Sequence, residues 1–296
     1  MTEPVQGGDV RPRHTPWAGG KKPFSIAMSP IALEDWLEND DRRLADLAEK
    51  AGVLSRVGDA VRIRPDTAAS QAEARDLIAA DLVRQGLDPR PVAPPERLAD
   101  GTPFAEAPPL LDAAMMLSDD LVIMRRGEEA WSLAAGVVAF PSGWHLPEKF
   151  DRPMNAIHQS VPGWAGPMAM RVARIFDNLS VDAPVWRLNW SIQFGGGLSL
   201  AGSKHDKPQA TGIAAPLVRV ERQTLRRLTT GDLLFTIKVM VDPVEAFAGH
   251  PDGAHLATSL ADQLDGLDAA QLAYKGLTKV RDTLAARLRD LAAATV

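Results

Sequence analysis

The sequence predicts an α+β protein in which an antiparallel sheet lies between helical segments. Apolar residues recur three or four apart near both ends of the chain, as in helices, and alternate with polar residues along several segments in the middle. Alternating βαβ units are missing from this pattern. We therefore expect an N-terminal arm and helical segment over residues 1–109, a strand-rich domain over residues 110–243 and a C-terminal helical segment over residues 244–296.

The N-terminal segment is predicted to hold an extended arm and two helices. Pro and Gly interrupt residues 1–23 too often for a regular element. Ser29, which precedes a proline, can cap a helix that runs over residues 29–52. A second helix is expected over residues 69–86. The proline-dense residues 89–109 are expected to form a loop that marks the domain boundary.

The central segment is predicted to form five strands and a helix. The clearest strand covers residues 186–194, where apolar and polar side chains alternate, so one face is expected to be apolar and the other polar. Helical spacing predicts a helix over residues 164–179. The other strands are expected at residues 121–124, 131–140, 217–222 and 233–241.

The C-terminal segment is predicted to be a helical cover. Its apolar stripe consists of Leu277, Val280, Leu284, Leu288 and Leu291. Such a stripe packs either on its own chain or on a partner, and packing on its own chain is the preferred interpretation because most amphipathic helices cover their own core.

The composition excludes several classes of site and partner. The chain has 33 Lys and Arg against 38 Asp and Glu and no basic run, so nucleic acid is not an expected partner. It has no cysteine, which excludes disulfides, thiolate nucleophiles, iron–sulfur clusters and a thiolate-bound haem. No segment approaches the ~18 consecutive apolar residues of a membrane span, and a secretory signal is not recognisable. A cytoplasmic protein is expected.

Residues 140–164 hold the densest group of chemically versatile side chains. The spacing of His145 and His158 matches no short zinc motif, whereas one axial histidine suffices for haem. His158 follows a stretch that can form a short helix, although on its own it is more simply a structural histidine. Five of the seven tryptophans fall between residues 121 and 195, where they can stack on a planar ligand or, as composition favours, fill the core.

A cluster of four arginines lies at residues 219–227, and Arg187 is on the polar face of the strand before it. Arginines bind ligand carboxylates through paired hydrogen bonds. A solvated strand end with salt bridges explains the same residues, and the residues alone favour that interpretation.

Four motifs in order point to a family. They are PWAGGKKPFSIAMSPI followed by DWLENDD, then FPSGWHLPEKF with IHQSVP, then WRLNW, then ERQTLRRL. Over residues 16–243 the chain thereby resembles the haem-dependent oxidative N-demethylases, whose catalytic subunit looks like a PAS domain converted from sensor to enzyme. The resemblance implies a PAS-like antiparallel sheet with a crossing helix, haem b with its iron, and oxidation of a small secondary amine such as dimethylamine by O2, giving a primary amine and formaldehyde.

The resemblance also implies roles for particular residues around the haem. His158 matches the family's histidine in the Ile-His motif and is the expected metal ligand. Lys149, Arg187 and Arg222 are candidates for the haem propionates, and Trp190 is a further candidate for cofactor binding.

Two residues are candidates for catalysis. Glu221 of the ERQTL motif is expected to hold the ammonium or move a proton, and Asn189 of the WRLNW motif is its candidate companion. The only tyrosine, Tyr274, lies outside the central segment, so a substrate cage built from tyrosine is not expected there. Cation recognition would then use Trp144, Trp164, Trp186 or Trp190 together with Glu221.

Electrons are expected to come from a separate protein. The chain has no cysteine, and the Gly-rich residues 195–197 lack the later glycine and the helix of a dinucleotide-binding loop. A reductase component carrying flavin and iron–sulfur centres, fed ultimately by NADPH, is the partner that the resemblance implies. The alternative is a non-catalytic PAS-like haem or small-molecule sensor; a sensor normally carries an output domain, and residues 244–296 suffice only for a helical cover.

Overall fold

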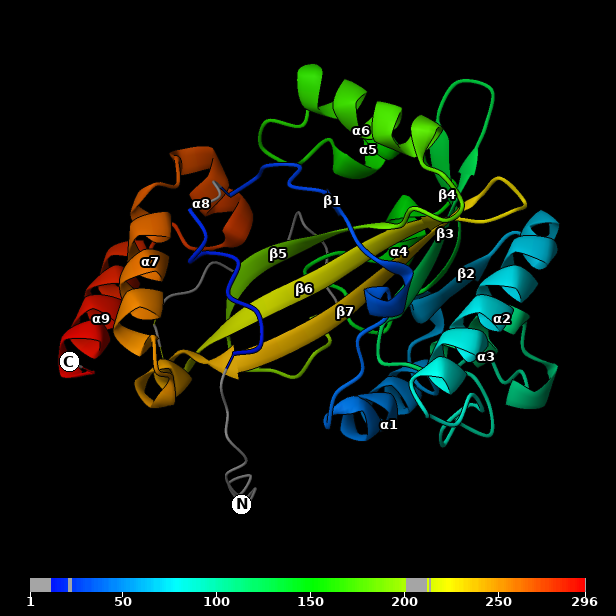
Figure 1. Ribbon diagram of the computed structural model, residues 1–296, viewed down its shortest axis with the longest axis horizontal. Coiled ribbons are helices and arrows are strands. Elements are labelled where there is room, and N and C mark those ends of the chain that lie inside the picture. The colour runs from blue at the N-terminus through cyan, green and yellow to red at the C-terminus, as the bar shows by residue number, and fades with distance from the viewer. Residues whose placement is uncertain (1–11, 21–22, 201–211, 213, 296) are drawn as a thin grey trace.

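The computed structural model describes residues 12–20, 23–200, 212 and 214–295, and its centre is a seven-stranded antiparallel sheet of order β1-β5-β6-β7-β3-β4-β2 (Figure 1). The predicted α+β class is confirmed. The strands are β1 (Ser29–Pro30), β2 (Val61–Ile63), β3 (Asp120–Arg126), β4 (Trp131–Val137), β5 (Val185–Phe194), β6 (Pro216–Arg227) and β7 (Leu233–Pro243).

Helices cover both faces of this sheet. They are α1 (Arg43–Leu54), α2 (Ala68–Arg84), α3 (Pro109–Ala114), α4 (Leu146–Lys149), α5 (Met154–His158), α6 (Pro167–Asn178), α7 (Gly253–Asp265), α8 (Ala269–Lys275) and α9 (Arg281–Ala294). In Figure 1, α5 and α6 lie above the sheet, α7 to α9 at its left and α1 to α3 at its right. Throughout the described residues, no helix is long and apolar enough to cross a membrane.

The alternation of side chains along each strand separates two environments. On β6, Leu225 packs with Val172 and Phe176 of α6, whereas Val218 and Val220 pack with α7 to α9. Because successive residues of a strand point to opposite faces, the odd-numbered residues of β6 share the α6 side of the sheet. The even-numbered residues share the side that carries the N-terminal and C-terminal helices.

Many predicted elements are confirmed near their expected bounds. They include α2, α6, β5, β7 and the hairpin of β3 and β4. Strand β6 continues to Arg227, beyond the predicted end at residue 222, because it pairs along its whole length with both β5 and β7. Strands β1 and β2, from residues 1–109, join the sheet of residues 110–243, and the division into three segments stays a prediction.

The predicted helix over residues 29–52 is wrong in its first part. Ser29 and Pro30 form β1 and pair with Trp186 and Val185 of β5. Helix α1 begins only at Arg43. The capping pattern of Ser before Pro was therefore a strand end, not a helix start.

Ion pairs to buried cations keep the chain between β1 and α1, apart from a short 3-10 turn at Leu33–Asp35, from forming an α-helix. A carboxylate oxygen of Glu38 lies 3.3 Å from Nε of Arg222, and one of Asp40 lies 3.0 Å from Nζ of Lys238. Both cations are almost fully buried in the sheet. An unpaired buried charge costs several kcal/mol, so these contacts outweigh local helix propensity.

The predicted N-terminal arm is anchored where the structure describes it; residues 1–11 and 21–22 lie outside the described residues. Trp17 is buried against the C-terminal helices, and its Nε1 donates to the carbonyl of Leu256 at 3.0 Å. We call residues 12–20 and 23–29 the N-terminal strap, because in Figure 1 they cross from the C-terminal helices to β1.

The C-terminal stripe packs on its own chain, as preferred. Leu277, Val280, Leu284 and Leu288 are buried in one core with Trp190 and Ile192 of β5, and Leu291 packs against them. The stripe is not one helix, however. Gly276 adopts a left-handed conformation with φ 72° and ends α8, so Leu277 and Val280 precede α9.

We predict that Asp46 lowers stability at neutral pH. Burial raises the pKa of Asp46 from 3.8 to about 6, so the folded protein favours the protonated side chain. The stabilisation that this gives is fully present below about pH 4 and is lost as the pH rises through 6. Through Asp46, the wild type should lose on the order of 1 to 2 kcal/mol of unfolding free energy between pH 5 and 7.5. Urea denaturation should show that this loss is absent in Asp46→Asn. The exposed Asp41→Asn is the control; equal pH slopes for both variants would contradict the prediction.

Candidate functional site

A cavity of about 740 Å³ lies on the α6 side of the sheet. Ligand pockets in proteins span roughly 300 to 1,000 Å³, so this one has room for a large organic group. Its apolar lining includes Val122 and Met124 of β3 and Val172 and Phe176 of α6. Charged side chains reach it from Lys149, Arg187, Glu221 and Lys275.

Strand pairing brings the polar residues of the cavity together. On β5, the polar face predicted from the sequence turns to the cavity through Arg187, Asn189 and Ser191. In the antiparallel register Asn189 lies opposite Glu221, and Arg187 lies opposite Gln223. Directly opposite residues share a face of the sheet, so β5 and β6 together build one polar wall.

Glu221 is a negatively charged group in that wall. Its Oε2 accepts hydrogen bonds from Nε2 of Gln223 at 2.9 Å and from Nδ2 of Asn189 at 3.4 Å, and its Oε1 lies 3.4 Å from Nε of Arg219. Burial acts to raise the pKa of Glu221, but the charge of Arg219 and these hydrogen bonds outweigh it and hold the pKa below its usual value. Glu221 is therefore a carboxylate at neutral pH.

Arg219 is fully buried behind Glu221 and connects three segments. Its two terminal nitrogens donate to the carbonyls of Leu198 and Phe140, each at 2.6 Å. The guanidinium thus holds the segments that follow β4 and β5 to β6 while it balances the charge of Glu221. The predicted arginine cluster is therefore divided among separate partners and is not a single carboxylate clamp.

His158 ends α5 and lines the cavity. Its Nδ1 lies 2.9 Å from the carbonyl oxygen of Met154, which can only accept, so Nδ1 carries the proton and the lone pair is on Nε2. The ring stacks on Trp164 with centroids 4.2 Å apart. A ring oriented in this way on a short helix is typical of a metal-binding imidazole.

Two further predicted residues contribute positive charge to the cavity. Lys149, at the end of α4, lies over the ring of Trp144 at 4.7 Å from its centroid. Arg187 on β5 has its Nε buried, and within the described part of the chain this atom has no hydrogen-bond partner. Burial lowers the pKa of Arg187, while Glu221 and Tyr274 act to raise it.

Arg222 does not reach the cavity, which corrects its expected place in a propionate clamp. Its position on β6 is even-numbered, so its side chain points to the opposite face of the sheet. There its guanidinium pairs with Glu38 and donates to the carbonyls of Trp36 at 3.0 Å and Asp35 at 2.6 Å.

Trp190 lines the cavity, but its ring belongs to the core under the C-terminal helices. The predicted residues that line the cavity are Lys149, His158, Arg187, Asn189, Trp190 and Glu221, together with Trp144 and Trp164, two of the tryptophans expected to recognise a cation.

Sequence reasoning missed the contribution of α8 and of the strap. Tyr274 and Lys275 line the cavity from α8, although the sequence places them more than fifty residues after Glu221. Phe24 of the strap meets Tyr274 edge to face with centroids 5.6 Å apart. The central segment itself supplies no tyrosine, as the sequence indicates, but the fold brings α8 to the edge of β5 and so places Tyr274 at the cavity from outside that segment.

Among the described residues, there is no group of three or more His, Asp or Glu side chains that could hold a metal ion. What the cavity offers is one oriented imidazole, a large apolar volume and charges of both signs.

Residues 94–285 match the family described as haem-dependent oxidative N-demethylase, alpha subunit-like (HODM_asu-like). The matched stretch covers 192 of the 296 residues. It includes β3 to β7 and all the predicted residues that line the cavity, whereas the strap and β1 lie outside it.

We predict that removing the charge of Arg219 destabilises the protein strongly. Arg219→Met leaves the buried carboxylate of Glu221 without its cation, and breaking a buried pair costs roughly 3 to 5 kcal/mol. Chemical denaturation measures this loss. The exposed pair of Arg126 with Asp177 provides the control, since Arg126→Met should cost less than about 1 kcal/mol; similar losses would contradict the prediction.

Proposed function

The chain belongs to the haem-dependent oxidative N-demethylase, alpha-subunit-like family, and from this we propose that it binds haem b in the cavity and oxidises an N-methyl group of a small secondary amine such as dimethylamine. The observation that carries the proposal is the pairing, in one large cavity, of an imidazole with its lone pair on Nε2 and a buried carboxylate. The first suits a haem iron and the second suits an ammonium.

The residues present fit a haem. A b-type haem needs an apolar slot, an axial donor and positive charge for two propionates. Apolar side chains of β3 and α6 supply the slot, and His158 is the donor. Lys149 and Arg187 would hold the propionates, and the buried Nε of Arg187 has an unmet hydrogen bond for one of them.

When bound, the haem supplies O2 activation at its iron for oxidation of the N-methyl group. Overall, the secondary amine, O2, two electrons and two protons give the primary amine, formaldehyde and water. The chain's own residues bind and orient the amine and exclude bulk water. The apolar lining from β3, α5 and α6 serves the last purpose.

Glu221 is assigned to binding the ammonium. A carboxylate with a lowered pKa stays charged and is a poor proton acceptor, so of the two expected roles the counter-ion suits it better. Asn189 donates to Oε2 of Glu221 and so orients it toward the cavity. A sensor that binds haem alone has no use for a buried charged carboxylate in the pocket, which favours the enzyme.

Electrons reach the site from another protein in this proposal. The chain has no cysteine for an iron–sulfur relay. The description of its family as alpha-subunit-like is consistent with a multi-component system. A reductase with flavin and iron–sulfur centres, supplied by NADPH, is the partner we propose.

Replacing His158 tests the haem site. His158→Ala should abolish the Soret band of hemin-reconstituted protein, because no other histidine lines the cavity in the described residues, and should leave the far-UV circular dichroism largely intact. His145→Ala, which changes a half-buried histidine outside the cavity, should keep the band. A native haem spectrum in His158→Ala would refute the ligand assignment, and no Soret band in wild-type protein after hemin addition would refute the function.

Replacing Glu221 tests the amine site. Glu221→Gln keeps the shape but loses the charge, so the affinity for dimethylamine, followed by amine-induced shifts of the haem spectrum, should fall about tenfold or more. Formaldehyde formed with peroxide or a matching reductase should fall as well. The exposed Glu148→Gln is the control, and unchanged affinity and turnover in Glu221→Gln would remove Glu221 from the mechanism.

A further inference from the structure

The carboxylate of Glu221 has little hydrogen-bonding capacity left for a guest. A carboxylate offers about four lone-pair sites to donors. Oε2 of Glu221 accepts from Nε2 of Gln223 at 2.9 Å and from Nδ2 of Asn189 at 3.4 Å, and Nε of Arg219 lies 3.4 Å from Oε1. About one site, on Oε1, therefore remains. Because Arg219 also offsets the charge of Glu221, the acceptors next to it matter for binding an ammonium.

The two amide side chains beside Glu221 direct their oxygens away from it. A carboxylate only accepts, so each amide presents its nitrogen to Glu221 and its oxygen, on the other branch of the same planar group, is free for another partner. Within the described part of the chain, neither Oε1 of Gln223 nor Oδ1 of Asn189 accepts a hydrogen bond. Both side chains line the cavity. The polar wall thus offers a guest two neutral acceptors next to a charged one.

Gln223 is the more firmly held of these two acceptors. Its bond to Glu221, at 2.9 Å, has the usual length, whereas the bond of Asn189, at 3.4 Å, is long. Gln223 is also the last polar residue of the wall on β6. Leu225 follows on the same face, opposite Phe235 of β7, and both line the cavity. A guest at Gln223 thus meets an acceptor and an apolar surface side by side.

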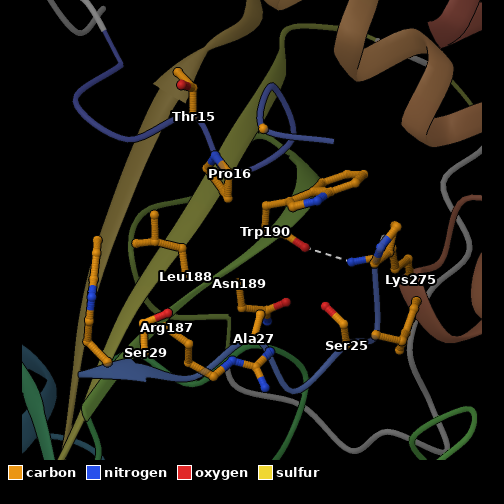
Figure 2. A pocket seen from close by; sticks show the side chains of 14 residues that line it. Thr15, Pro16, Ser25, Ala27, Ser29, Arg187, Leu188, Asn189, Trp190 and Lys275 are labelled. Atoms are coloured by element: carbon orange, nitrogen blue, oxygen red, sulfur yellow. Dashed lines mark hydrogen bonds between the residues drawn. The ribbon is translucent and has the colours of Figure 1, made fainter. Parts of the chain in front are cut away.

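The N-terminal strap lies along the β5 end of this wall (Figure 2). A space of about 210 Å³ adjoins the cavity there, and it is lined by Ser25 and Ser29 of the strap and by Arg187 and Asn189 of β5. Asn189 lines both spaces. The smaller space lies below the roughly 300 Å³ of ordinary ligand pockets, so a guest beside the wall has room for only a few non-hydrogen atoms there.

Secondary and tertiary ammonium ions differ in the number of N–H groups that this wall must satisfy. Glu221 can accept from one of them, so the second N–H of a secondary ion needs a further acceptor. In a tertiary ion a methyl group takes the place of that second donor. A methyl group set against Oε1 of Gln223 would remove water from this oxygen and give no hydrogen bond in return, which is unfavourable.

We propose that Gln223 determines which amines the site binds: its Oε1 accepts the second N–H of a secondary ammonium whose first N–H is bound by Glu221, and tertiary amines therefore bind more weakly. The inference rests on the proposed function and identifies the residue that sets its selectivity. The methyl groups of the bound ion lie against the apolar surface of Leu225 and Phe235. Gln223 thus binds substrate in addition to orienting Glu221.

Binding of dimethylamine and trimethylamine to the haem-loaded protein, measured by calorimetry, tests this assignment. Both amines are cations at neutral pH and differ by one donor, so the wild type should bind dimethylamine about tenfold more tightly or better. Gln223→Met keeps the length of the side chain but has no strong acceptor, so the preference should fall below roughly threefold. Gln193→Met is the matched control, because Gln193 shares the polar face of β5 but lines neither space; it should keep the preference.

The ratio of the two affinities separates this role from a merely structural one. If Gln223 only oriented Glu221, its loss would weaken both amines by the same factor and leave the preference unchanged. That outcome in Gln223→Met, or equal affinities in wild type with an intact haem spectrum, would overturn the assignment alone. Absence of a haem spectrum in the wild type would instead overturn the proposed function, and the inference with it.

A second variant covers the case in which Gln223→Met does not fold. Gln223→Asn keeps the amide but draws it back by one methylene group, so its oxygen no longer reaches the ammonium and the preference should fall severalfold. The Soret band and the far-UV circular dichroism show whether each variant is folded and loaded with haem. An unchanged preference in a folded Gln223→Asn would show that Gln223 does not select the amine.

Discussion

Three buried cations on the two central strands control how the rest of the chain is arranged. Arg219 and Arg222 on β6 and Lys238 on β7 are at most 3% exposed. A buried charge without a partner is too costly to keep, so each must bring carboxylates or carbonyl groups to the sheet. The ion-pair and hydrogen-bond partners of Arg222 and the ion-pair partner of Lys238 lie in residues 35–40. Arg219 pairs with Glu221 and donates to the carbonyls of Phe140 and Leu198.

The same requirement links the core to the chemistry of the cavity. Alternation along β6 sends Arg222 to the side of the N-terminal segment, where it fixes the chain before α1. It sends Glu221 to the cavity, with Arg219 as its counter-charge. A carboxylate that stays charged inside an apolar cavity can bind a cation tightly, because the protein has already desolvated and oriented it. Stability and binding thus depend on one ion pair.

The cavity combines segments that are distant in the sequence. Its walls come from the strap, from β3, from residues 142–168, from the polar wall of β5 and β6, and from α8. These segments meet at the edge of β5, because β1 pairs with only two residues of that edge. The strap and Lys275 lie along the remainder of it. A strand that covered this edge in full would close the space of about 210 Å³ that Thr15, Ser25 and Ser29 line beside β5.

Local sequence patterns predicted the α+β class, the clear strands, helices α2 and α6 and the short helix that carries His158, because these depend on periodicity along the chain. They also predicted a polar face along residues 186–194, and the resemblance of the motifs pointed to the family. Three features became evident only from the folded chain: Ser29 and Pro30 form a strand, Arg222 points away from the cavity, and Lys275 lines it. The reason is physical: these outcomes are decided by ion pairs and strand register between residues far apart in the chain, which no local pattern encodes.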